Sequence, residues 1–293
     1  MIKKDILERY NIKPTSFKKI NNIIVAGENN KQVVFKKVKE KKNALFDYLK
    51  SRSFNYMPEY IYDSNYEISP YIKSYNVDDA TKAEDLINIV SLLHLKTTSY
   101  KKTNLDDMKK IYEDLKEQIY YLKNYYEDMN EIIENDVYMS PSSYLLVRNI
   151  TKVYNALSYC ENELDSFYEE VKSLDKIRVV TLHNNLDLSH ILVGEGKYLI
   201  SWDKSKTDMP LYDIYNFYQK YYQTLDFDIL ISQYEERYPL LSYERKLLFI
   251  MISLPKKIEF THDEYVNTTN VNDLFYYLFK GDSIISPYYS KNE

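Results

Sequence analysis

Up to about Ile72 the apolar residues come in short runs, which is the pattern of β-strands. The runs of β-branched and aromatic residues cover 17–20, 23–26, 32–36 and 67–72. Turn-forming residues, Asn21-Asn22 and 27–30, separate the first three runs, so we expect a three-stranded meander. One helix is expected over 44–50, where apolar residues have helical spacing.

Helical spacing dominates the rest of the chain. Thr81 and Glu84 have the spacing of a capping box, so a helix is expected to begin there. A long helix is expected over 106–139. A second long helix is expected from Ser140-Pro141, where a capping serine precedes a proline at the first helical position.

The second long helix carries an apolar seam whose members alternate by four and three residues. These members are Leu146, Ile150, Val153, Leu157, Cys160, Leu164, Phe167 and Val171. Two interpretations remain open: an antiparallel helix pair over 106–174 within the chain, or a self-association surface over 141–174. The short junction favours the pair, because closely joined helices pack on each other. Cys160 is expected to fill the core.

These elements predict a two-lobed α+β protein. A small antiparallel β-rich lobe is expected over 1–72, and a large, mainly helical lobe over 73–293. Within the second lobe, polar side chains gather in the segment 179–214. A short strand over 178–183, a polar loop over 184–190 and a hairpin ending near Trp202 would bring them to one end of a small sheet.

Composition narrows the classes of function. Lys and Arg number 39 and Asp and Glu 44, a net charge of −5, so no basic surplus favours a nucleic-acid partner. Four glycines are too few for a Walker A loop or a dinucleotide-binding fingerprint, and one cysteine excludes an internal disulfide. The chain starts with charged residues and has no long apolar stretch, so we expect a cytoplasmic protein without a membrane span.

Three stretches of the polar segment carry a more specific pattern: 182–193 with His183-Asn184-Asn185, 198–203 ending in Trp202-Asp203, and 208–214. In order and spacing they resemble the aminoglycoside phosphotransferase and choline kinase group of kinase-like folds. Within that group the chain is most similar to the spore-coat protein S family. The resemblance implies a two-lobed, protein-kinase-like fold.

The chain departs from the active members of this group at three positions. Their loop reads His-x-Asp-x-x-x-x-Asn, and the strand after it ends in Ile-Asp. The resemblance puts Asn185 at the catalytic aspartate, and His190 and Ser201 at the two metal-binding positions. An amide is too weak a base to accept the proton of an attacking hydroxyl, and Mg²⁺ prefers hard oxygen ligands. We therefore expect a degenerate site with no metal bound.

One alternative remains open, a metal site shifted along the chain. Asp187 and Asp203 each lie two residues after a lost carboxylate. In an extended strand, side chains two residues apart share a face, so Asp203 would point in the same direction as Ser201. Asp203 would then serve as a metal ligand and Asp187 as a substitute catalytic residue.

Other positions have supporting roles in the resemblance. Lys36 matches the lysine that contacts the nucleotide, and Glu40 is the nearest carboxylate in the segment after it. An ion pair between them and a solvated run of charges are both compatible with the sequence. His183 and Asp213 are expected to support the loop by hydrogen bonding.

The expected function is that of a pseudokinase acting as a binding or assembly protein. Its partners would be proteins, with spore-coat components the ones implied by the resemblance, and no cofactor is expected. Its location would be the cytoplasm or the spore coat. The alternative is an enzyme that transfers a phosphoryl group to a small alcohol, which would need ATP and Mg²⁺.

Overall fold

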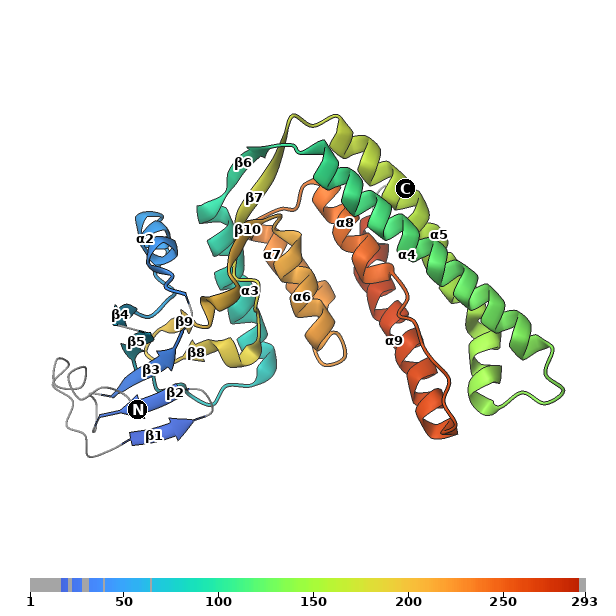
Figure 1. The fold of residues 1–293 in the computed structure, drawn as a ribbon, viewed down its shortest axis with the longest axis horizontal. Helices are drawn as coiled ribbons and strands as arrows, with labels where there is room; N and C mark the ends of the chain where they lie inside the picture. The colour runs from blue at the N-terminus through green and yellow to red at the C-terminus, as the bar shows by residue number, and fades with distance from the viewer. Residues whose placement is uncertain (1–16, 21–22, 28–31, 39, 64, 290–293) are drawn as a thin grey trace. The chain divides into compact units, whose positions relative to one another are not determined.

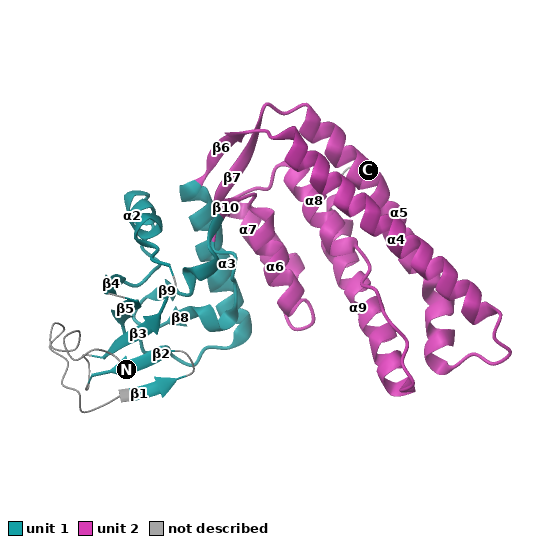
Figure 2. Ribbon diagram, viewed as in Figure 1, with its two compact units in different colours: residues 1–97, 183–206 teal, residues 98–182, 207–293 magenta. Residues whose placement is uncertain are grey.

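The chain forms two compact units in the computed structural model (Figures 1 and 2). The described residues are 17–20, 23–27, 32–38, 40–63 and 65–289. The first unit comprises residues up to Thr97 together with 183–206, and the second comprises 98–182 together with the residues from Thr207 onward. The turns expected at Asn21-Asn22 and 28–30 lie outside the described residues.

A five-stranded antiparallel sheet in the order β1-β2-β3-β5-β4 forms the framework of the first unit. Its strands are β1 (Phe17–Ile20), β2 (Ile23–Ala26), β3 (Val33–Lys37), β4 (Ile61–Asp63) and β5 (Tyr66–Pro70). Side chains alternate between the faces of a strand, so Phe35 and Ile68 pack on one face with Ala26. Lys36 and Glu67, paired across β3 and β5, belong to the other face. The expected meander is confirmed.

The described part of the first unit also contains two helices, a short hairpin and two 3₁₀ turns. They are α2 (Asn43–Ser51), α3 (Asp79–Thr97), η1 (Leu188–His190), β8 (Ile191–Val193), β9 (Lys197–Leu199) and η2 (Trp202–Lys204). The expected capping box at Thr81 is wrong, because α3 begins at Asp79. The carboxylate of Asp78 accepts the Thr81 N–H at 2.9 Å, and so provides the cap.

The second unit is mainly helical. Its elements are β6 (Ser99–Lys102), α4 (Leu105–Glu134), α5 (Pro141–Lys172), β7 (Lys176–Leu182), α6 (Leu211–Tyr221), α7 (Phe227–Arg237), α8 (Ser242–Ser253) and α9 (Glu264–Tyr289). β10 (Lys206–Asp208) adds a third strand beside β7. None of the helices in the described part of the chain combines the length and the apolar composition that crossing a bilayer requires.

The antiparallel pairing of the two long helices is confirmed (Figure 1). α5 begins at Pro141 with Ser140 as its cap, as expected. Every member of its apolar seam is buried, because α4, α8 and α9 of the same chain pack around it. Burial raises the pKa of Cys160 to about 12, in keeping with a core residue. Self-association through helix 141–174 stays a prediction.

The fold class is confirmed: an antiparallel β-rich region is followed by a mainly helical one. The two compact units, however, do not divide at the expected lobe boundary after Ile72. The reason is that α3 contacts η1, β8 and β9, which keeps this helix and the polar loop with the sheet-bearing unit. The division into lobes at 72 and 73 stays a prediction.

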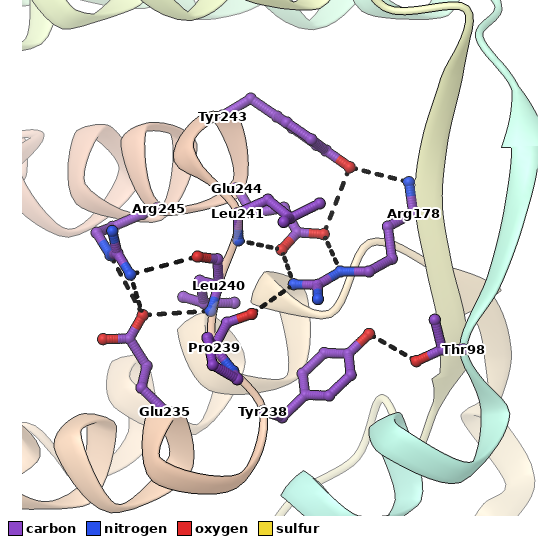
Figure 3. A network of polar contacts seen from close by, with 10 residues as sticks. All are labelled: Thr98, Arg178, Glu235, Tyr238, Pro239, Leu240, Leu241, Tyr243, Glu244 and Arg245. Carbon is purple, nitrogen blue, oxygen red and sulfur yellow. Dashed lines mark hydrogen bonds and ion pairs between the residues drawn. The ribbon is translucent and has the colours of Figure 1, made fainter.

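A buried ion pair joins β7 to α8 within the second unit (Figure 3). Nε of Arg178 donates to Glu244 at 3.0 Å, and Nη2 of the same arginine also contacts this carboxylate. Glu244 is fully buried and accepts the N–H of Leu241, while the guanidinium lies 4.3 Å from the ring centre of Tyr238. Each charge is therefore compensated by the other and by nearby polar groups.

Replacing Glu244 by Gln should lower the free energy of unfolding by about 3–5 kcal/mol, because the charge of Arg178 stays buried without its partner. Urea denaturation followed by circular dichroism measures the change. Glu236→Gln, an exposed change on α7, is the matched control and should have an effect within about 0.5 kcal/mol. An equal loss of unfolding free energy in the two variants would show that the ion pair of Arg178 and Glu244 contributes no special stability.

Candidate functional site

A pocket of about 350 Å³ lies within the first unit. One wall is the face of the sheet that carries Lys36 and Glu67, and Pro70, Tyr71, Ile72 and Ser74 border it. Ile200 and Ser201 complete the lining from the segment after β9. The volume is that of a site for a small molecule, and the lining mixes apolar surface with a few polar groups.

Hydrogen bonds fix the polar loop 183–190 to the segment after β9. They are His183 Nε2 to Ile200 O (2.8 Å), Asn184 Nδ2 to Lys204 O (3.0 Å) and Ile200 N to His190 O (2.9 Å). Asn184 has a φ of 56°, a left-handed conformation that asparagine adopts more readily than most residues. The loop and the segment are therefore held by bonds to main-chain atoms.

The structure brings together Asn185, His190 and Ser201, the three residues that the resemblance places at the catalytic and metal positions. Nδ1 of His190 donates to the carbonyl of Asn185 at 2.7 Å. Nδ2 of Asn185 lies 3.5 Å from the carbonyl of Ser201, at the limit of a hydrogen bond. The side chains of Asn185 and His190 thus point donor nitrogens at main-chain oxygens. These contacts brace the loop.

The strand expected over 198–202 is shorter than predicted, because β9 ends at Leu199. Ser201 adopts a φ of 69°, and η2 follows it at once. Trp202 is buried between Phe54 and His183, with ring centres 6.0 and 4.8 Å away, and this packing holds the turn. The premise that Asp203 shares a strand face with Ser201 is therefore wrong, since the chain is not extended there.

Asp203 pairs with Lys36. The Nζ of Lys36 lies 2.5 Å from the carboxylate of Asp203, and the two side chains are 23% and 48% exposed. The sequence left open an ion pair between Lys36 and Glu40, but Glu40 instead contacts Lys42 at 3.2 Å. The lysine expected to contact a nucleotide is thus occupied by a carboxylate of the same chain.

Asp187 has a local role. Its side chain accepts the N–H of Ser189 at 3.0 Å and the hydroxyl of Ser189 at 2.7 Å, which caps η1. A cap of this kind satisfies donors that a helical turn leaves open. Use of Asp187 as a substitute catalytic residue stays a prediction.

His183 and Asp213, the two expected supports of the loop, are both fully buried. Nε2 of His183 donates to the carbonyl of Ile200, in the segment after β9. Asp213 belongs to the second unit, in the first turn of α6. Its support of the loop stays a prediction.

Sequence reasoning missed Glu67, a carboxylate that lines the pocket beside Lys36. The hydroxyl of Tyr62 donates to Glu67 at 2.6 Å. Burial raises the pKa of Glu67, and it also raises the pKa of Tyr60 and Tyr62. A signal was present, because an antiparallel pairing of 32–36 with 67–72 would have placed a residue of the second strand beside Lys36.

The site does not fit the Mg²⁺ that the resemblance would associate with it. Mg²⁺ requires hard oxygen ligands, yet the positions that the resemblance assigns to the metal hold an imidazole and a neutral hydroxyl, and Asp203 is bound to Lys36. Among the residues that the structure describes, no group of three or more His, Cys, Asp or Glu side chains is arranged to hold a metal ion.

Two comparisons by sequence give no match for this chain. No protein-family model matches it, and no curated protein matches it. Comparison by structure is more informative, because a fold persists after sequence similarity has been lost.

Solved structures of phosphotransferases and kinases resemble the chain. An aminoglycoside phosphotransferase from Alicyclobacillus acidocaldarius matches with a TM-score of 0.67 at 10% identity, covering 99% of this chain and 96% of that one. The AMP-bound spectinomycin phosphotransferase matches with a TM-score of 0.49 at 13% identity, covering 96% of this chain and 92% of that one. Choline kinase from Streptococcus pneumoniae matches with a TM-score of 0.47 at 16% identity, covering 99% of this chain and 96% of that one. The first likeness shows that this chain has the kinase-like fold of an aminoglycoside phosphotransferase.

Proposed function

We propose that this chain is a pseudokinase, a protein with a phosphotransferase fold that no longer transfers phosphoryl groups and acts as a binding or assembly protein. One observation carries the proposal. Asn185, His190 and Ser201 stand where active members of the resembling group have an aspartate, an asparagine and an aspartate. The contacts of Asn185 and His190 are to main-chain carbonyls of the loop and of the segment after β9.

The chemistry of these groups supports the proposal. Phosphoryl transfer to an alcohol needs a carboxylate that positions the hydroxyl and accepts its proton, and an amide such as Asn185 is not a useful base. Loss of one general base costs about 10²–10⁴-fold in rate. The two metal positions have changed as well. Both the deprotonation of the alcohol and the binding of the metal are therefore impaired.

The contacts of the two nearby carboxylates argue against the shifted metal site. Asp203 is bound to Lys36 at 2.5 Å, and Asp187 accepts two hydrogen bonds from Ser189. Recruiting them would require breaking the ion pair and uncapping η1. A small-alcohol kinase is therefore the rival that the experiment must test.

The surface supports a role in protein binding. Several tyrosines of the second unit are largely exposed: Tyr100 (61%), Tyr120 (67%), Tyr138 (90%) and Tyr265 (81%). Tyrosine is enriched at protein interfaces, because its ring is apolar and its hydroxyl forms hydrogen bonds. The resemblance of 182–214 to the spore-coat protein S family makes coat components the partners that we propose.

Purified protein incubated with ATP, Mg²⁺ or Mn²⁺ and a panel containing choline, ethanolamine, aminoglycosides and sugars should produce no phosphorylated alcohol, because the general base and the metal ligands are missing. Phosphorus-31 NMR and mass spectrometry of the acceptors measure this. Metal-dependent turnover that persists in Asp47→Ala, an exposed change on α2, and disappears in Asp203→Ala would establish the shifted site and reject the proposal.

ATP with Mg²⁺ should raise the melting temperature no more than ATP alone, because the site offers no suitable metal ligands. A ligand that binds only the folded state stabilises it by RT ln(1 + [L]/Kd), so differential scanning fluorimetry detects binding without turnover. A larger stabilisation with Mg²⁺ than without it, abolished by Asp203→Ala, would show that a metal joins the nucleotide.

A further inference from the structure

We infer that the pocket of the first unit binds a small organic cation, an amidinium or ammonium group on an apolar body, through the carboxylate of Glu67. The inference rests on the proposed function, because a pocket that served Mg²⁺ and ATP would have to favour phosphate. In a pseudokinase, the same pocket would take a small organic cation in place of the nucleotide.

The charges around the pocket favour a cation over an anion. Lys36 is the one cation among the described lining residues, and Asp203 contacts its Nζ at 2.5 Å. Glu67 adds a second negative charge on the neighbouring strand. Lys36, Asp203 and Glu67 together have a net charge of −1 when Glu67 is ionised. A triphosphate without its metal would meet repulsion here, whereas a cation would be attracted.

The placement of Glu67 carries the second step. It is the cross-strand partner of Lys36 and lines the same pocket. The hydroxyl of Tyr62 donates to its Oε2 at 2.6 Å, which fixes the direction of the carboxylate. In the inferred complex, the second oxygen, Oε1, accepts an N–H from the ligand. Hydrogen bonds of this charge-assisted kind are the stronger ones in proteins.

The rest of the lining suits the body of such a ligand. Val34, Ile200 and Leu192 supply aliphatic surface, and Tyr60 and Tyr71 supply aromatic surface. Aromatic rings attract cations through their electron-rich faces and also pack against flat apolar groups. A volume of about 350 Å³ accommodates a single-ring compound with its charged substituent.

Benzamidine, benzamide and benzoate test the inference, because they have nearly the same shape and carry charges of +1, 0 and −1. Isothermal titration calorimetry on the full chain should give the order benzamidine, then benzamide, then benzoate. Glu67→Gln should weaken benzamidine by about tenfold and leave benzamide unchanged, since the lost interaction is with a charge. Equal affinities for the three compounds would overturn the inference.

Glu59→Gln is the matched control, because it removes the same charge from an exposed side chain close to the pocket. It should leave benzamidine binding almost unchanged. Asp203→Asn should shift the preference toward benzoate, because it frees the charge of Lys36 inside the pocket. Benzamidine binding that is equally weakened by both glutamate changes would indicate a long-range field and reject the specific role of Glu67.

The pH dependence adds an independent readout. Burial raises the pKa of Glu67, which is faced by Lys36, Tyr60, Tyr62 and Asp203. A cation binds the ionised carboxylate, so benzamidine affinity should rise as the pH passes this raised pKa and then level off. In Glu67→Gln the rise should disappear. A rise that persists in Glu67→Gln would assign the titration to another group and count against the inference.

Failure of this inference and failure of the proposed function give different results. Phosphorylated alcohol in the turnover assay rejects the pseudokinase and leaves the order of the benzamidine series to be measured on its own. A chain without turnover that binds benzoate and ATP more tightly than benzamidine rejects only the cation pocket. Each outcome is read from a separate assay.

Discussion

The site depends on the way in which the loop 183–190 and the segment after β9 hold each other through main-chain oxygens. His183 bonds to the carbonyl of Ile200, whose own N–H returns to the carbonyl of His190. His190 in turn donates to the carbonyl of Asn185. Because every link ends on a peptide group, the geometry of the loop is fixed by donors that need no catalytic chemistry. These bonds do not depend on a carboxylate at the position of Asn185 or Ser201.

The turn that follows β9 affects the charge of the pocket, because it places Asp203 against Lys36. Ser201 adopts a left-handed conformation, which costs a residue other than glycine about 1–2 kcal/mol, and η2 follows. The buried ring of Trp202, packed against Phe54 and His183, supports this conformation. The turn leaves Asp203 in contact with Lys36. The lysine is thereby neutralised, and Glu67 becomes the charge that a ligand would meet.

Sequence patterns predicted most of the fold, because the elements concerned bury one regular face. The seam of α5 and the cap at Ser140 are local signals, and both were confirmed. The contact of Lys36 with Asp203 joins residues 167 positions apart, and the role of Glu67 follows from the register of β3 against β5. No local sequence pattern indicates the contact of Lys36 with Asp203 or the role of Glu67. The left-handed Ser201 was also missed, because the apolar run before it indicates a strand that continues.

The present contacts also bear on whether a catalytic aspartate would be compatible with this loop. The amide nitrogen of Asn185 faces the carbonyl of Ser201 at 3.5 Å, so this position supplies a donor to an acceptor. A carboxylate there would bring two acceptors together. Repulsion of this kind would displace either the loop or the segment after β9. Asn185, the conformation of Ser201 and the pairing of Asp203 with Lys36 are therefore mutually consistent.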